Sequence, residues 1–225
     1  MPSLAAAHGA SHDDVLVRRY DHAGRAMLFS TGLAVFALTF FGETILGIWV
    51  GPAAASGAWQ PLALLATGFW FSACVSGAYI AAIACGKPIL VLKISALSVV
   101  PYVVVLVSLM ELFGLNGAAG AWLALNIGYV LVIVPMVHRT ILLIPTRPWF
   151  TGMLVPFLAL GVASFGAARL ALMAFGETPN LATQAIMLVA GAAAYLFFGM
   201  RLLGAPIRAE LRGMLQRALG RQGGK

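Results

Sequence analysis

The sequence is poor in charge, and acidic residues are especially scarce. Only 9% of its 225 residues are charged and seven are Asp or Glu, whereas 61% are hydrophobic and the mean hydropathy is +0.96. A soluble domain carries about 25% charged residues and needs a polar shell around its core. This chain cannot supply such a shell, so we expect lipid rather than water to surround most of it.

Motifs of enzyme active sites and of metal sites are also missing. The chain contains no HExxH, Walker loop or GxSxG pattern. His8 and His12 have helical i, i+4 spacing, but no third ligand of the usual kind is evident. We therefore predict no catalytic residue, no metal and no cofactor, and the chain is not expected to be an enzyme.

Long apolar runs dominate the rest of the chain. A bilayer core of roughly 30 Å requires about 20 apolar residues per helix, and six runs reach that length. Clusters of Gly, Pro and Asn separate them, as turns require. The sequence thus predicts an all-α membrane bundle of six transmembrane helices. The runs cover approximately 27–50, 62–85, 88–110, 117–137, 149–173 and 182–203.

The basic residues predict how these helices are oriented. With six spans, thirteen of the 14 Lys and Arg residues fall on one side and only Arg169 falls on the other. Basic residues in short clusters between apolar runs report membrane topology rather than a surface for nucleic acid. The basic side is expected to be cytoplasmic, so both termini lie in the cytoplasm of a bacterial cell with the chain in its inner membrane.

Three regions follow from this pattern. Residues 1–25 form a cytoplasmic segment with a short amphipathic helix from about residue 12, and residues 26–203 form the transmembrane domain. Residues 204–225 form a basic cytoplasmic tail. An interfacial helix on anionic lipid and a solvated tail both agree with its spacing of apolar residues.

Polar side chains inside apolar spans are candidates for a binding site, because burying them in hydrocarbon is costly. Our hypothesis is that they line a hydrated cavity. The alternative is that they bond to their own helix at i−4 and join neighbouring helices. Lys93 either extends to the lipid headgroups or contacts an anionic phosphate. The candidate substrate-binding residues are Lys93, Ser76, Tyr79, Ser98, Tyr102 and Asn126.

Small residues recur every fourth position in two of the spans. One stripe comprises Gly120, Ala124 and Gly128, and a similar one occurs in the run 62–85. Such stripes allow helix backbones to approach closely in lipid. We therefore predict tight helix packing along both of them.

Four local patterns recur at or near the ends of the apolar runs: Met1-Pro2-Ser3-Leu4-Ala5-Ala6-Ala7 with Asp13-Asp14 and Arg18-Arg19-Tyr20, Ile48-Trp49-Val50-Gly51, Ala82-Ile83-Ala84-Cys85-Gly86-Lys87 and Gly114-Leu115-Asn116-Gly117-Ala118-Ala119. Together they resemble the O-antigen and exopolysaccharide flippases of the multidrug/oligosaccharidyl-lipid/polysaccharide exporter superfamily. The similarity covers about residues 1–140, and the last two spans fit as the usual terminal pair. Family members carry twelve to fourteen helices in two lobes, so this chain resembles only the C-terminal portion, beginning inside the second lobe.

The resemblance implies a function and a set of partners. The expected function is membrane transport of an undecaprenyl-pyrophosphate-linked oligosaccharide for polysaccharide or lipopolysaccharide biosynthesis. The expected partners are membrane lipid and either a separate N-terminal lobe or a second copy of the chain, and not nucleic acid. Three alternatives stay open at this point: half of a cation-coupled multidrug exporter, a membrane enzyme of glycan assembly, and a membrane partner subunit that does not transport.

Overall fold

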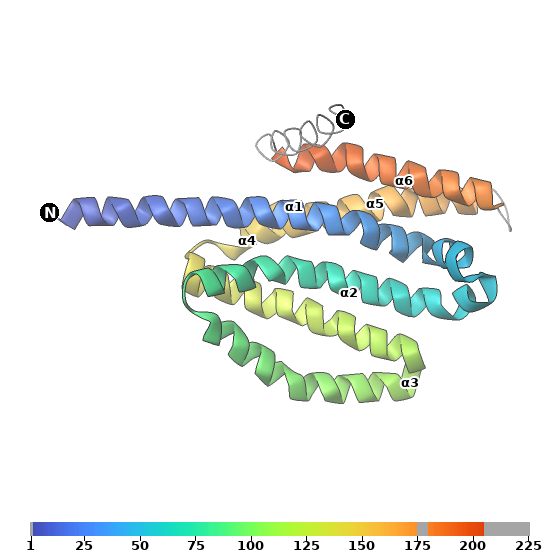
Figure 1. Ribbon diagram of the computed structural model, residues 1–225, viewed down its shortest axis with the longest axis horizontal. Coiled ribbons are helices and arrows are strands. Elements are labelled where there is room, and N and C mark those ends of the chain that lie inside the picture. Colours follow the sequence, from blue (N-terminus) through green and yellow to red (C-terminus); the bar gives the residue numbers. More distant parts are fainter. Residues whose placement is uncertain (1, 175–179, 205–225) are drawn as a thin grey trace, which may run out of the picture.

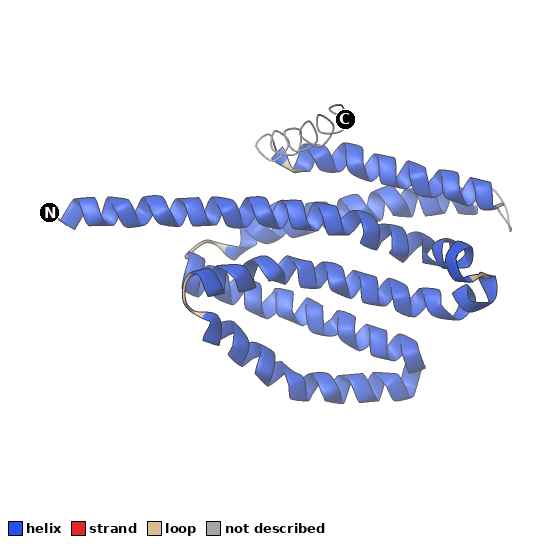
Figure 2. Ribbon diagram, in the orientation of Figure 1, coloured by secondary structure: helices blue, strands red, loops and turns tan. Residues whose placement is uncertain are grey.

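The computed structural model describes residues 2–174 and 180–204, with side chains described from Val15 onward. Within these ranges the chain is helical and has no strand (Figures 1 and 2). The elements are α1 (Pro2–Val50), α2 (Pro52–Ala84), α3 (Pro88–Val137), η1 (His138–Leu142), α4 (Thr146–Trp149), η2 (Phe150–Leu154), α5 (Val155–Met173) and α6 (Leu181–Leu202). The all-α prediction is confirmed. The predicted tail falls almost wholly outside the described residues, which end at Gly204.

Five helical stretches in the described part are long and apolar enough to cross a membrane. Three of them, Val15–Val50, Pro52–Ala84 and Leu181–Leu202, are single helices. The other two combine several elements: Pro88–Leu142 joins α3 to η1, and Thr146–Ala174 joins α4, η2 and α5. The six predicted spans therefore map onto five apolar stretches, because the runs 88–110 and 117–137 both lie in α3.

The first helix is longer than a bilayer crossing requires. At 1.5 Å per residue its 49 residues extend about 73 Å, and its first turns reach beyond the other helices (Figure 1). The predicted N-terminal helix is therefore continuous with the first predicted span, and it begins at Pro2 rather than near residue 12. At Phe41 the backbone leaves helical geometry (φ −124°, ψ 17°) and the helix bends.

The second helix begins earlier than predicted. The sequence predicts an apolar run that starts near residue 62, but α2 starts at Pro52, and Pro61 lies buried inside it. Gly51 (φ 93°) ends α1, and a proline at the start of a helix loses no hydrogen bond because its missing N–H would have no partner there. The turn between the first two helices is consequently confined to Gly51.

The third helix folds back on itself at Gly114. This glycine has φ 59° and ψ −133°, a conformation that side-chain-bearing residues rarely adopt. We call residues 88–113 the first arm and residues 115–137 the second arm. The arms run antiparallel in Figure 1, and the Ser98 hydroxyl lies 2.6 Å from the Tyr129 hydroxyl across them. The predicted break between residues 110 and 117 is thus a tight reversal.

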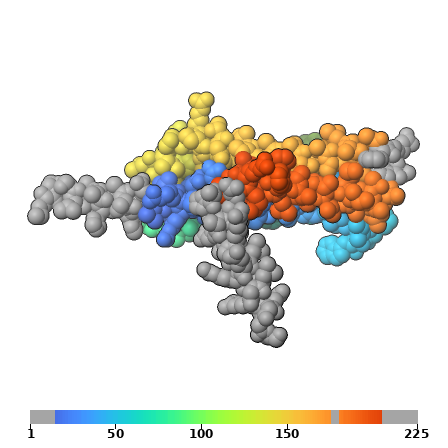
Figure 3. Space-filling model, turned by 90° about the horizontal axis from the view of Figure 1, so that it is seen from above, coloured from blue at the N-terminus to red at the C-terminus, as the bar shows by residue number. Residues whose placement is uncertain are grey.

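The bundle has α1 near its middle. α1 packs against α2 on one side and against α5 and α6 on the other, whereas α3 packs mainly on α2. Figure 3 looks onto α6, beside which α5 and part of α1 are visible. The α3 hairpin therefore forms an outer edge of the molecule, opposite α6 (Figure 1).

Candidate functional site

Two predicted site residues, Tyr79 and Ser98, each pair with a hydroxyl of a neighbouring helical segment. The Tyr79 hydroxyl of α2 lies 2.6 Å from the Ser95 hydroxyl in the first arm of α3, and the Ser98–Tyr129 pair links the two arms. All four side chains are only partly buried. Helix-to-helix bonds of this kind hold helices together in an apolar medium. These hydroxyls are therefore engaged with one another across the α2–α3 layer.

Ser76 and Asn126 bond to their own helices. The Ser76 hydroxyl donates to the Ser72 carbonyl at 3.0 Å, and the Asn126 amide donates to the Trp122 carbonyl at 2.9 Å. Both bonds have i−4 spacing within one helix. This is the arrangement expected if these polar residues bond to their own helix rather than line a hydrated cavity. Asn126 is buried, so the structure places it within the packed interior rather than on an open surface.

Ser98 and Tyr102 line an open groove between the arms of α3, which we call the α3 groove. Its volume is about 280 Å³. Lys93 is exposed and directly precedes a residue of the lining. The lining is mostly apolar and comprises Ile94, Ser98, Pro101, Tyr102, Val105, Ala121, Ala124, Leu125, Gly128, Tyr129 and Val132.

The small-residue stripe of the second arm does not make the predicted tight helix contact. A Cβ atom added at Gly120 or Gly128 would meet nothing within 4 Å, and Ala124 is exposed. Ala124 and Gly128 instead form part of the α3 groove. The stripe on α2 does pack, because a Cβ at Gly77 would lie 3.2 Å from the Tyr20 ring.

Basic side chains gather at one end of the bundle, which we call the basic end. Four segments lie toward this end (Figure 1): the start of α1, the α2–α3 connection, the segment after α3 and the C-terminal end of α6. Two contacts bring these segments together: Lys87 donates to the Thr140 carbonyl at 3.4 Å, and Arg25 to the Leu202 carbonyl at 3.5 Å. The basic residues of these segments are Arg18, Arg19, Arg25, Lys87, Lys93, Arg139, Arg147 and Arg201.

Acidic side chains are few in the described part of the chain. Asp21 lies at the basic end and pairs with Arg25 at 2.8 Å. Glu43 lies in the last turns of α1 and Glu111 just before the Gly114 reversal, so both belong to the opposite end. The charge asymmetry that the sequence predicted therefore corresponds to two ends of one helical bundle.

The sequence did not predict a buried polar cluster that lies at the basic end. The Tyr20 hydroxyl of α1 is 2.9 Å from Nε2 of His138, which is fully buried in η1. The Trp149 ring packs edge-on against the imidazole. Nδ1 of His138 has no hydrogen-bond partner among the described residues. The one available signal was a lone histidine at the end of an apolar run, but its partner Tyr20 is remote in sequence.

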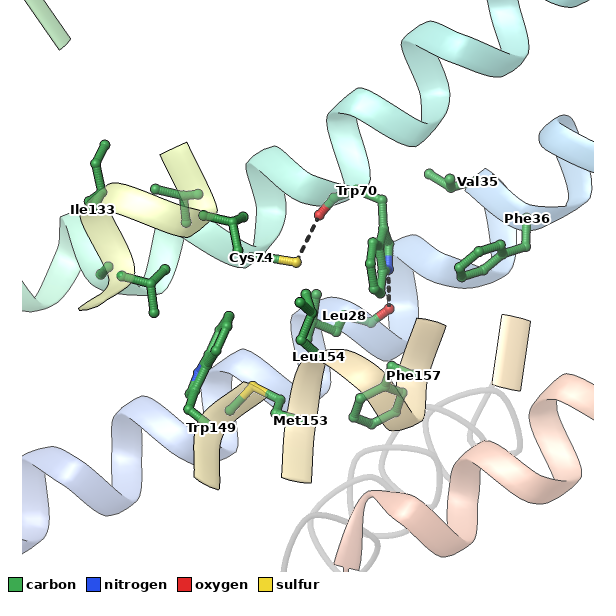
Figure 4. Packing of buried hydrophobic residues seen from close by; sticks show 14 of the residues in the cluster. Leu28, Val35, Phe36, Trp70, Cys74, Ile133, Trp149, Met153, Leu154 and Phe157 are labelled. Carbon is green, nitrogen blue, oxygen red and sulfur yellow. Dashed lines mark hydrogen bonds between the residues drawn. The ribbon is translucent and has the colours of Figure 1, made fainter. Parts of the chain in front are cut away.

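A second missed cluster lies where α1, α2 and α6 meet. Trp70 of α2 donates from its ring nitrogen to the Leu28 carbonyl at 3.2 Å (Figure 4), and Tyr195 of α6 donates to the Phe29 carbonyl at 3.1 Å. Trp70 and Tyr195 are fully buried. Both polar tips reach the backbone of α1 next to Gly32, whose missing side chain leaves space for them. This cluster holds the bundle together.

No group of three or more potential metal ligands occurs among residues whose placement is described. The side chains of His8 and His12 lie outside the described side chains.

Comparisons with known proteins add no assignment. A scan against protein-family models and searches against curated proteins and solved structures found no match to this chain.

Proposed function

We propose that this chain is embedded in a bacterial inner membrane, crosses it six times, and has both termini on the cytoplasmic side. Five apolar stretches have the length of membrane crossings, and the one containing α3 reverses at Gly114, so that its two arms count as separate crossings. The gathering of basic residues at one end of the bundle is the observation that carries this proposal, because cytoplasmic loops of membrane proteins are enriched in Lys and Arg.

The exposed surface supports the same proposal. Large apolar side chains cover the outward face of the first arm, and Leu97, Val100 and Leu112 are each more than two thirds exposed. Contiguous apolar surface of this extent is rare on soluble monomers. Lipid hydrocarbon is the medium in which such a surface requires no polar covering.

Within this bundle, the function we propose is that of one lobe of a flippase for lipid-linked oligosaccharide. The support is the resemblance noted in the sequence, together with where its motifs fall. Ile48-Trp49-Val50-Gly51 lies at the end of α1, Gly86 (φ 68°) ends α2, and Gly114 marks the α3 reversal. These three motifs therefore lie at helix boundaries, as in the family pattern, whereas the pattern containing Arg18-Arg19-Tyr20 lies within α1.

The proposed mechanism needs a second lobe. In transporters built from repeats, the substrate binds between two halves that rock against each other around a central site. The undecaprenyl pyrophosphate-linked oligosaccharide would bind with its headgroup between this bundle and a partner lobe, which is either a separate chain or a second copy. If the partner lobe is a separate chain, this chain expressed alone should leave glycan export unrestored in a flippase-deficient strain. Restoration by the chain alone would instead favour a second copy as the partner lobe.

Deletion of the gene in its own bacterium tests the transport proposal. We expect surface polysaccharide to be lost and undecaprenyl-pyrophosphate-linked oligosaccharide to accumulate in extracted membranes, with both effects reversed by a plasmid copy of the gene. Normal surface polysaccharide without accumulation of the lipid-linked precursor would contradict the flippase assignment. It would leave the membrane assignment standing.

A further inference from the structure

The α3 groove runs lengthwise along the hairpin and extends away from the basic end. Because the arms are antiparallel, Ile94 and Val132 lie at its mouth near the basic end, and Val105 and Ala121 lie at its far end. The twelve residues from Ile94 to Val105 are separated by eleven rises of 1.5 Å, which is about 16 Å of helix. Half of a bilayer core of roughly 30 Å is about 15 Å. The groove therefore has the length of one leaflet's hydrocarbon layer.

The shape and chemistry of the groove limit what it can hold. The arms contact each other through the Ser98–Tyr129 pair at 2.6 Å, so no second helix, about 10 Å wide, can insert between them. These two hydroxyls already bond each other, and the remaining lining is apolar apart from Tyr102. A polar ligand would lose its bonds to water without replacement, whereas a hydrocarbon chain would lose none.

Among the described residues, the cationic side chains of the hairpin and of the segments that flank it lie toward the mouth of the groove. Lys93 is exposed one residue before Ile94, and Lys87 reaches the Thr140 carbonyl beside Arg139. The acidic residue of the hairpin, Glu111, lies toward the Gly114 reversal, beyond the far end of the groove. An anion is therefore favoured at the mouth, where the phosphate of a lipid would lie if its chain occupied the groove.

We infer that the α3 groove binds one acyl chain of an anionic phospholipid from the leaflet at the basic end, with the lipid phosphate held by Lys87, Lys93 and Arg139. The occupant is a membrane lipid and not the transported substrate. The inference rests on the membrane-embedded part of the proposed function and is independent of whether the bundle transports anything.

Two glycines of the second arm give a matched pair of variants. A Cβ at either Gly128 or Gly120 meets nothing within 4 Å, so neither position has a neighbour that blocks an added side chain at its first atom, yet of the two only Gly128 lines the groove. Gly128→Leu should fill the groove, whereas Gly120→Leu should leave it open. Lys93→Gln should weaken the preference for an anionic headgroup while leaving the groove unchanged.

The test is native mass spectrometry of the purified full chain equilibrated with phosphatidylglycerol or phosphatidylcholine in mixed micelles. We expect wild-type protein and Gly120→Leu to retain phosphatidylglycerol equally well. Displacing as few as two methylene groups lowers affinity by about tenfold, so Gly128→Leu should bind at least that much more weakly. Lys93→Gln should reduce the preference for phosphatidylglycerol by about fivefold.

Equal retention of phosphatidylglycerol by Gly128→Leu and wild type would overturn the inference. A Gly128→Leu variant that loses a dimer and keeps its lipid would also overturn it, because the groove would then be a contact between copies. Release of the chain from membranes by alkaline carbonate would instead show that the membrane assignment itself is wrong. The two failures are therefore distinguishable.

Discussion

The hydroxyl of Tyr195 occupies the space that a side chain at position 32 would fill. Gly32 of α1 faces it directly, and the Trp70 ring nitrogen lies 3.2 Å from the same point. Two similar contacts bring α1 against α5 and α6, where the Phe36 ring fills the notch at Gly161 and the Phe29 ring fills the notch at Gly199. Aromatic side chains set into glycine notches thus join the central helix to its neighbours.

Replacing Gly32 with Ala should destabilise the bundle by about 1–3 kcal/mol, because the added methyl overlaps the Tyr195 hydroxyl. The measurement is the free energy of unfolding in detergent micelles titrated with a denaturing detergent. Gly120→Ala is the matched control, since its methyl meets nothing and alanine favours a helix by roughly 0.5–1 kcal/mol.

Removing the Tyr195 hydroxyl should partly rescue the Gly32→Ala variant. The double variant Gly32→Ala/Tyr195→Phe is expected to be less destabilised than the sum of the two single variants, with a coupling of about 0.5–3 kcal/mol. Simple additivity would show that the two residues are not in contact.

Tyr20 and His138 should be energetically coupled across the basic end. Tyr20→Phe removes the partner of Nε2 in a fully buried imidazole, which costs about 1–3 kcal/mol. In a His138→Phe background the same tyrosine substitution should cost markedly less, because no buried nitrogen is left unpaired. Thermal unfolding of the four proteins of this cycle measures the difference. An identical cost in both backgrounds would contradict the hydrogen bond.

Gly114→Ala should strain the α3 reversal. A residue with a side chain at φ 59° and ψ −133° costs about 1–3 kcal/mol. Gly47→Ala is a suitable control, because Gly47 is in α1 and a Cβ there meets nothing within 4 Å. Equal stability of the two variants in micelles would show that the arms do not reverse at this residue.

Local patterns in the sequence were sufficient to predict the helices and most of the positions at which they end. Apolar length predicted the long helices, and Gly114 marked the α3 reversal because few other residues adopt its conformation. The sequence places the start of the second helix too late, because Gly51 ends α1 and α2 begins directly after it at Pro52 and continues through Pro61. Helix propensity shows that a proline can occupy the first turn of a helix. Tertiary packing decides whether the helix actually begins at that proline.

The candidate site was less predictable than the helices. Spacing along one helix correctly grouped Ser98 with Tyr102, which line the same groove. It could not show that Ser98 pairs with Tyr129 or that Tyr20 reaches His138, because such contacts depend on how distant helices pack. The same limitation applies to the second-arm stripe, because Ala124 and Gly128 line a groove rather than a helix contact.

The hydrated-cavity hypothesis can be tested at the groove itself. In a background lacking Cys74 and Cys85, a membrane-impermeant thiol reagent should fail to label cysteine at position 98 or 102, because lipid fills a mostly apolar lining. Cysteine introduced at position 51, where α1 ends, should be labelled and serves as the positive control. Rapid labelling at 102 would favour water in the groove and the original hypothesis.

The alternating orientation of the helices is tested most directly by mapping which side of the membrane each connection occupies. Single cysteines at Gly86 and Pro145 should be modified by an impermeant reagent only in inside-out vesicles, and those at Gly51 and Gly114 only in intact spheroplasts. Agreement at all four positions is the result expected for the bundle proposed here. Modification of the cysteines at positions 51 and 86 from the same side of the membrane would contradict the alternating orientation.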